Sequence, residues 1–125
     1  AAVRPEAIVW FRRLDASGQK WKRQSLPYPP NAGTAKAVAI GDLNGDGIKD
    51  IAFTCENSTK GKEGVWWFEQ SRGGGWRTHR VSGPKGIKFD RIELLDLDGD
   101  GDLDLLTTEE RTPLGVIWYE NPTRN

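Results

Sequence analysis

Two segments of the chain carry nearly the same pattern of aspartate and glycine. The first covers residues 42–50, and the second covers residues 96–104, which begin 54 residues later. In both, oxygen-bearing side chains stand at positions 1, 3, 5 and 9, and glycines stand at positions 4 and 6. A pattern that recurs at this spacing restricts the fold, because it indicates a chain built from repeated structural units.

Aromatic residues recur with a similar period. Trp10, Trp67 and Trp118 lie in similar apolar triplets, separated by 57 and 51 residues. Trp21 and Trp76 open a second pair of similar segments, 55 residues apart. A period of 51 to 57 residues is typical of blade-type repeats.

The segments around these markers have the character of short β-strands. They are rich in β-branched and aromatic residues and are separated by Gly, Pro, Asn and Ser. No window of a dozen residues shows a helical period of 3.6. The expected strands are residues 35–40, 50–55, 64–69, 76–81, 89–95, 104–108 and 115–120. We therefore predict an all-β fold of β-propeller blades with four antiparallel strands each, and about two repeats in this chain.

The strands of one repeat are named a, b, c and d in chain order. Residues 1–34 then form a partial blade (c, d), residues 35–83 a complete blade, and residues 84–125 a partial blade (a, b, c). A propeller needs about 4–8 blades to close its ring, so this chain cannot close alone. We expect either self-association into a closed propeller or the remainder of a longer chain. Because methionine is absent, we expect the translation start to lie outside this sequence.

The repeated loops have the composition of a calcium site. Ca²⁺ takes about 6–8 oxygen ligands, and glycine allows the sharp turns that bring alternate side chains together. The predicted ligands of the first site are the side chains of Asp42, Asn44, Asp46 and Asp50 and the carbonyl of Ile48. Those of the second site are the side chains of Asp96, Asp98, Asp100 and Asp104 and the carbonyl of Asp102, whose carboxylate is expected to point outward. We expect two structural Ca²⁺ ions.

Three other interpretations of these loops fit the sequence less well. An EF-hand requires a glutamate at position 12 and flanking helices, but Phe53 and Thr107 stand there between expected strands. Mg²⁺ is disfavoured because it keeps several of its waters. Asp- and Gly-rich turns without metal are disfavoured because converging carboxylates repel one another.

The motif Asp-x-Asp/Asn-x-Asp-Gly-x-x-Asp, followed by the strand Ile117-Trp118-Tyr119-Glu120-Asn121, resembles the VCBS/FG-GAP repeat family. These are propeller blades of the integrin α-subunit type, and the likeness is strongest to the bacterial secreted branch. The resemblance implies a seven-bladed-type architecture, calcium at each a–b turn and an extracellular or periplasmic location. The Phe-Gly and Gly-Ala-Pro motifs of the family's name are missing, so partners do not transfer. Relatives serve as adhesion modules, lectins or scaffolds, so the family does not fix a function.

Four residues are candidates for a ligand surface. Trp66 is an extra aromatic residue beside the recurring Trp67, and Glu109, Glu110 and Arg111 form a charged loop. No catalytic set is assigned, because the single histidine and single cysteine, His79 and Cys55, have Gln24 and Glu109 at their repeat-equivalent positions.

Composition excludes several classes of partner. The formal net charge is zero, which argues against nucleic acid, and no apolar run reaches the roughly 20 residues of a membrane span. We expect a non-enzymatic binding and assembly module for carbohydrate or protein. The alternatives are a purely structural scaffold within a larger propeller and a propeller-based polysaccharide-degrading enzyme.

Overall fold

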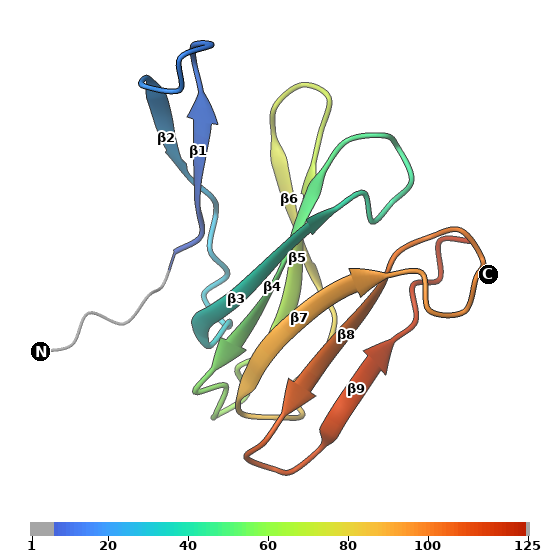
Figure 1. The fold of residues 1–125 in the computed structure, drawn as a ribbon. Helices are drawn as coiled ribbons and strands as arrows, with labels where there is room; N and C mark the ends of the chain where they lie inside the picture. Colours follow the sequence, from blue (N-terminus) through green and yellow to red (C-terminus); the bar gives the residue numbers. More distant parts are fainter. Residues whose placement is uncertain (1–6, 125) are drawn as a thin grey trace, which may run out of the picture.

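The computed structural model describes residues 7–124, which contain nine β-strands and no helix (Figure 1). The strands are β1 (Val9–Arg13), β2 (Trp21–Ser25), β3 (Thr34–Gly41), β4 (Asp50–Glu56), β5 (Val65–Gln70), β6 (Trp76–Arg80), β7 (Phe89–Leu95), β8 (Asp104–Glu109) and β9 (Gly115–Tyr119). Each strand range predicted from the sequence is confirmed to within one residue. In the part of the chain that is described, no helix is long and apolar enough to cross a membrane.

The nine strands form three separate antiparallel sheets. Their orders are β1-β2, β3-β4-β5-β6 and β7-β8-β9, so within each sheet the strands pair in chain order. Figure 1 shows the sheets fanned out in chain order, with the ends of β3 and β7 leading into the two Asp/Gly loops. The all-β class is confirmed, and the described strands do not close into a ring.

The four-stranded sheet is packed on both faces, which explains why β4 is buried along almost its whole length. Because side chains alternate along a strand, Phe53 and Phe68 point to one face, where their rings stack at 5.0 Å. Ala52 and Val65 point to the other face, where they pack against Phe89 of the three-stranded sheet.

Neighbouring sheets meet through the first strand of each unit. Ile92 and Leu94 of β7 pack against the four-stranded sheet, and Ile92 is only 7% exposed. Counted from the start of each Asp/Gly loop, their equivalents in β3 are Val38 and Ile40. These two side chains are 53% and 66% exposed, because the two-stranded sheet β1-β2 does not cover them.

The opposite end of the molecule has a matching exposed face. Val65 in β5 is fully buried by the three-stranded sheet, and Trp67 beside it is half-buried. Their equivalents in β9, Val116 and Trp118, are 72% and 43% exposed. The same positions are therefore covered where the four-stranded sheet packs against the three-stranded sheet, which is called the inner joint below. They are uncovered on the outer strand of the three-stranded sheet.

Candidate metal centre

The two candidate metal loops, residues 42–50 and 96–104, connect the first two strands of their sheets. Each reverses direction through two glycines in the left-handed region of backbone conformation. Gly45 and Gly47 have φ values of 76° and 86°, and Gly99 and Gly101 have values of 81° and 94°. Side chains with a Cβ rarely adopt this conformation, which explains the glycines at positions 4 and 6.

The first aspartate of each loop holds the turn together. Asp42 accepts hydrogen bonds from the backbone N–H groups of Gly45 and Gly47, both at 2.8 Å. Asp96 accepts the corresponding bonds from Gly99 and Gly101, at 2.7 and 3.0 Å. The two loops therefore share one local structure.

The side chains at positions 3 and 5 each cap the backbone two residues further on. At position 3, Asn44 Oδ1 accepts a hydrogen bond from the backbone N–H of Asp46 at 3.1 Å. Asp98 Oδ1 accepts the corresponding bond from the N–H of Asp100 at 3.2 Å. At position 5, Asp46 Oδ1 accepts from the N–H of Ile48 at 2.8 Å, and Asp100 Oδ1 accepts from the N–H of Asp102 at 3.0 Å. Each carboxylate therefore keeps a second oxygen that this repeated network does not use.

The last aspartate of each loop is buried and ties the loop to its sheet. Asp104 accepts from the N–H of Leu97 at 3.0 Å and from the N–H of Asn121 at 2.8 Å. Burial opposes ionisation of this carboxyl, but these hydrogen bonds outweigh it and lower the pKa of Asp104. Asp50 makes the equivalent bonds to Leu43 and Gln70, yet burial and the nearby aspartates raise its pKa.

Carboxylate oxygens converge in the second loop. Asp96, Asp98 and Asp104 each place one oxygen so that all three lie within 4.8 Å of one another. Asp100 Oδ2 is buried and has no hydrogen-bond partner. Desolvation raises the pKa of Asp98, and the charges of Asp100 and Asp104 raise it further. An all-oxygen set of this kind fits a hard cation such as Ca²⁺.

The expectation that Asp102 points its carboxylate outward is wrong. Its side chain is only 5% exposed, and Oδ2 accepts a hydrogen bond from the N–H of Arg124 at 2.9 Å. Oδ1 is buried without a partner. The reason is that the segment after β9 folds back over the loop and covers this position.

That returning segment also connects the two loops, a role the sequence did not reveal. Asn121 Nδ2 donates to the carbonyl of Leu43 at 2.7 Å and to the carbonyl of Leu103 at 3.0 Å. Leu43 belongs to the first loop and Leu103 to the second, so one side chain spans both.

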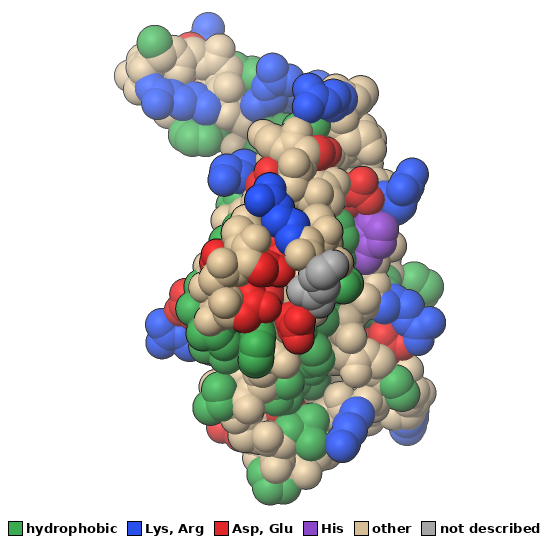
Figure 2. Space-filling model, turned by 90° about the vertical axis from the view of Figure 1, so that its right-hand side faces the viewer, with side chains coloured by type: hydrophobic (Ala, Val, Ile, Leu, Met, Phe, Trp, Pro, Cys, Tyr) green, Lys and Arg blue, Asp and Glu red, His purple; other side chains and the backbone are tan. Residues whose placement is uncertain are grey.

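On the face seen in Figure 2, acidic side chains gather in one patch with basic side chains beside it.

The first loop has its own polar neighbours. Asn44 Nδ2 lies 3.3 Å from Glu69 Oε1, and Glu69 Oε2 lies 2.7 Å from His79 Nε2. The guanidinium of Arg72 donates to the carbonyl of Asp46 at 2.9 Å. No motif in the sequence predicts these contacts, because they form only when β5, β6 and the turn between them pack beside the first loop.

The predicted ligand surface at Trp66 is wrong. This side chain is 3% exposed and belongs to the apolar cluster on the face with Phe53 and Phe68. Its indole N–H donates to the carbonyl of Glu63 at 3.0 Å. Since side chains alternate along β5, the neighbouring Trp67 lies on the other face.

The predicted patch of Glu109, Glu110 and Arg111 is only partly a surface. Glu109 is 2% exposed and is an anchor for two loops rather than a recognition residue. Desolvation opposes its ionisation, but hydrogen bonds from Thr112, Leu114, Lys88 and Ile87 hold the pKa of Glu109 well below its usual range. Glu110 and Arg111 are exposed, and Glu110 pairs with Lys88.

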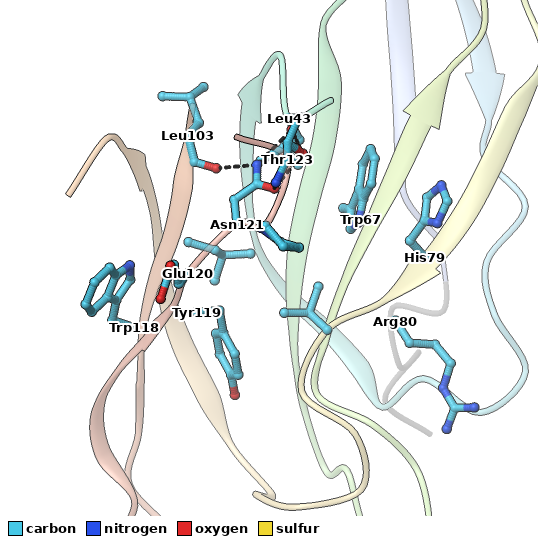
Figure 3. A pocket seen from close by; sticks show the side chains of 13 residues that line it. Leu43, Trp67, His79, Arg80, Leu103, Trp118, Tyr119, Glu120, Asn121 and Thr123 are labelled. Carbon is cyan, nitrogen blue, oxygen red and sulfur yellow. Dashed lines mark hydrogen bonds between the residues drawn. The ribbon is translucent and has the colours of Figure 1, made fainter. Parts of the chain in front are cut away.

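A cavity of about 580 Å³ opens between the four-stranded and three-stranded sheets (Figure 3). On one side it is lined by Trp67 and His79, whose rings stack at 4.3 Å. On the other side it is lined by Trp118, Tyr119 and Asn121. Leu43 and Leu103 also line it, so the cavity lies next to both metal loops.

Comparison with family models, with curated proteins and with solved structures finds no match to this chain. The functional conclusions that follow therefore depend on the geometry of the loops, the cavity and the exposed sheet faces.

Proposed function

We propose that this chain is a calcium-binding β-propeller segment with a binding and assembly role, and that its loops hold two structural Ca²⁺ ions. The observation that carries the metal assignment is the pair of buried carboxylate oxygens in the second loop, Asp100 Oδ2 and Asp102 Oδ1, which have no hydrogen-bond donor. Leaving charged oxygens buried without a partner is costly, and a bound cation removes that cost. Calcium sites of extracellular modules have Kd values of about 10⁻⁴–10⁻³ M, which suits an extracellular or periplasmic setting.

The assembly role is supported by the repeated joint between sheets. In blade terms, β1-β2 supplies strands c and d, β3–β6 a complete blade, and β7–β9 strands a, b and c. Val38 and Ile40 are exposed where their equivalents, Ile92 and Leu94, pack against the preceding sheet. Strand β1 pairs with β2 on one edge only, so its other edge is open for a further strand.

We propose that the occupant of this open face is an a–b strand pair with small apolar side chains. At the inner joint, Ala37, Ala39 and Ala52 are the residues that face the next sheet. A second copy of the chain would offer its β7 instead, which carries Arg91 and Glu93 at the two alanine positions of β3. Burying that ion pair against Val38 and Ile40 is unfavourable, so the matching strands come from a blade of different sequence.

Calcium removal tests the metal assignment. A ligand that binds only the folded state at 100 times its Kd stabilises it by about 2.7 kcal/mol per site. Differential scanning calorimetry in about 10 mM calcium (about that excess for a Kd near 10⁻⁴ M) and in excess EGTA is expected to show a Tm lower by about 10 °C or more without calcium. Magnesium at the same concentration is the control and is expected to restore little of the loss. Equal melting curves in calcium and EGTA would contradict the assignment.

Carbohydrate recognition is a second candidate function, favoured by the cavity between the sheets. Ligand pockets combine apolar and aromatic walls with a few polar groups that fix orientation. Here Trp67, Trp118 and Tyr119 supply the aromatic walls, and Asn121 and Thr123 supply polar groups. We propose a neutral oligosaccharide as the ligand, with Trp67 in the role expected of Trp66.

Glycan binding can be measured directly on an array, followed by calorimetry with the best ligand. Trp67→Ala is expected to weaken binding at least tenfold, because it removes a wall of the cavity. Trp21→Ala is the matched control, since Trp21 is 52% exposed on β2 and does not line the cavity. A blank array, or equal losses in the two variants, would overturn this candidate function.

A further inference from the structure

The two metal loops differ at two of their five odd-numbered positions. Position 3 is Asn44 in the first loop and Asp98 in the second, and position 7 is Ile48 in the first and Asp102 in the second. The first loop thus carries three carboxylates, at Asp42, Asp46 and Asp50. The second carries five, at Asp96, Asp98, Asp100, Asp102 and Asp104.

Asp102 has an environment that its counterpart lacks. Its side chain is 5% exposed, and the backbone N–H of Arg124 satisfies only one of its two oxygens. Asp100, two residues earlier, and Asp102 each have one buried carboxylate oxygen without a hydrogen-bond donor. The guanidinium of Arg124 passes over Gly101 but satisfies neither oxygen.

Carboxylate oxygens that are buried without a donor are costly, and a cation bound directly to them removes that cost. The hydrogen bonds of the loop do not supply that charge, because they come from neutral backbone groups and reach the other oxygens. Ile48 places no charge at this point of the first loop. The surplus of charge is therefore a property of the second loop alone.

We propose that the second loop, which carries two more carboxylates than the first, binds calcium more tightly than the first loop and fills before it. The inference rests on the proposed calcium-binding function. Calcium affinity rises with the number of charged ligands in a loop, and two further carboxylates are expected to separate the two Kd values by about tenfold or more.

Isothermal titration of the calcium-free full chain with CaCl₂ tests the order of filling. The wild type is expected to show two classes of site, one ion each. Asp102→Asn is expected to weaken the tight class about tenfold or more and to leave the weak class unchanged. Asn44→Asp, in the first loop, is the complementary variant and is expected to tighten the weak class only.

Terbium luminescence identifies which loop fills first, because the indole of Trp118 lies close to Asp104 and can sensitise an ion bound there. The first equivalent of Tb³⁺ is expected to give the signal, and Trp118→Phe is expected to remove it. A single class of site, or an unchanged tight class in Asp102→Asn, overturns the inference while leaving calcium binding intact. No binding heat at all overturns the proposed function itself. If Asp102→Asn does not fold, Asn44→Asp still decides: an unaltered ratio of the two Kd values overturns the inference.

Discussion

The Glu109→Ala variant is expected to lose about 4 kcal/mol or more of unfolding free energy, since each buried group left unpaired costs about 1–3 kcal/mol. The buried Glu109 carboxylate, at the end of β8, accepts hydrogen bonds from the two loops that flank it. Its donors are the backbone N–H groups of Ile87, Lys88, Arg111, Thr112 and Leu114 and the hydroxyl of Thr112. Without the carboxylate, those donors must find water or open the loops. Urea unfolding followed by circular dichroism measures the loss.

Glu110→Ala is the matched control for this experiment. Glu110 is the next residue, carries the same charge and pairs with Lys88 at the surface. Exposed ion pairs contribute about 0–1 kcal/mol, so this variant is expected to stay near the wild type. Equal losses at the two positions would show that charge in the loop, and not the buried hydrogen-bond hub, determines stability.

The Glu109 hub also predicts a dependence on pH. The pKa of Glu109 is held well below its usual range in the folded protein, whereas in the unfolded chain it is about 4.3. A lowered folded-state pKa gives stability that is fully present above the unfolded value and is lost as the pH falls below it. The difference in stability between wild type and Glu109→Ala is therefore expected to be constant from pH 6 to 7 and to narrow below about pH 4.

The strands and loops were predictable because their signals are local. Strands β3 and β4 are bounded by turn residues, and the glycines of the metal loops occupy the positive-φ positions that the pattern requires. Both features depend on the chain within a few residues. The sequence therefore predicted strand ranges to within one residue and placed both loops between paired strands.

The wrong predictions concern residues whose surroundings come from distant parts of the chain. Trp66 and Trp67 are adjacent tryptophans, and alternation along the strand puts their side chains on opposite faces of the sheet. The sequence does not say which of the two faces another part of the chain covers. Glu109 looked like a surface charge, since the loops that enclose it lie up to 22 residues away. Asp102 is covered by Arg124, which is likewise 22 residues away. Such burial follows from tertiary packing and not from spacing or composition.

Supplying the missing strand pair is the second change expected to have a large effect. A copy of residues 33–57 joined directly ahead of Ala1 reproduces the spacing that separates Cys55 from Trp67, with Trp10 in the place of Trp67. The added strands are expected to pair with the open edge of β1 and to cover Val38 and Ile40. Burying two such side chains contributes about 1.5–3 kcal/mol each when they are fully covered, and here they are already partly covered. The expected gain is about 3 kcal/mol, or about 10 °C in Tm.

The matched control is the same fusion with Arg and Glu at the copied positions of Ala37 and Ala39, which imitates β7 with its Arg91 and Glu93. Charged side chains at those two places would be buried against Val38 and Ile40, so this fusion is expected to gain little or no stability. Calorimetry compares the melting temperatures, and light scattering checks that both proteins are monomers. If the two fusions melt alike, small apolar side chains are not what the open face selects. A gain in the first fusion alone would support the specific partner proposed for it, because only the facing side chains differ between the two proteins.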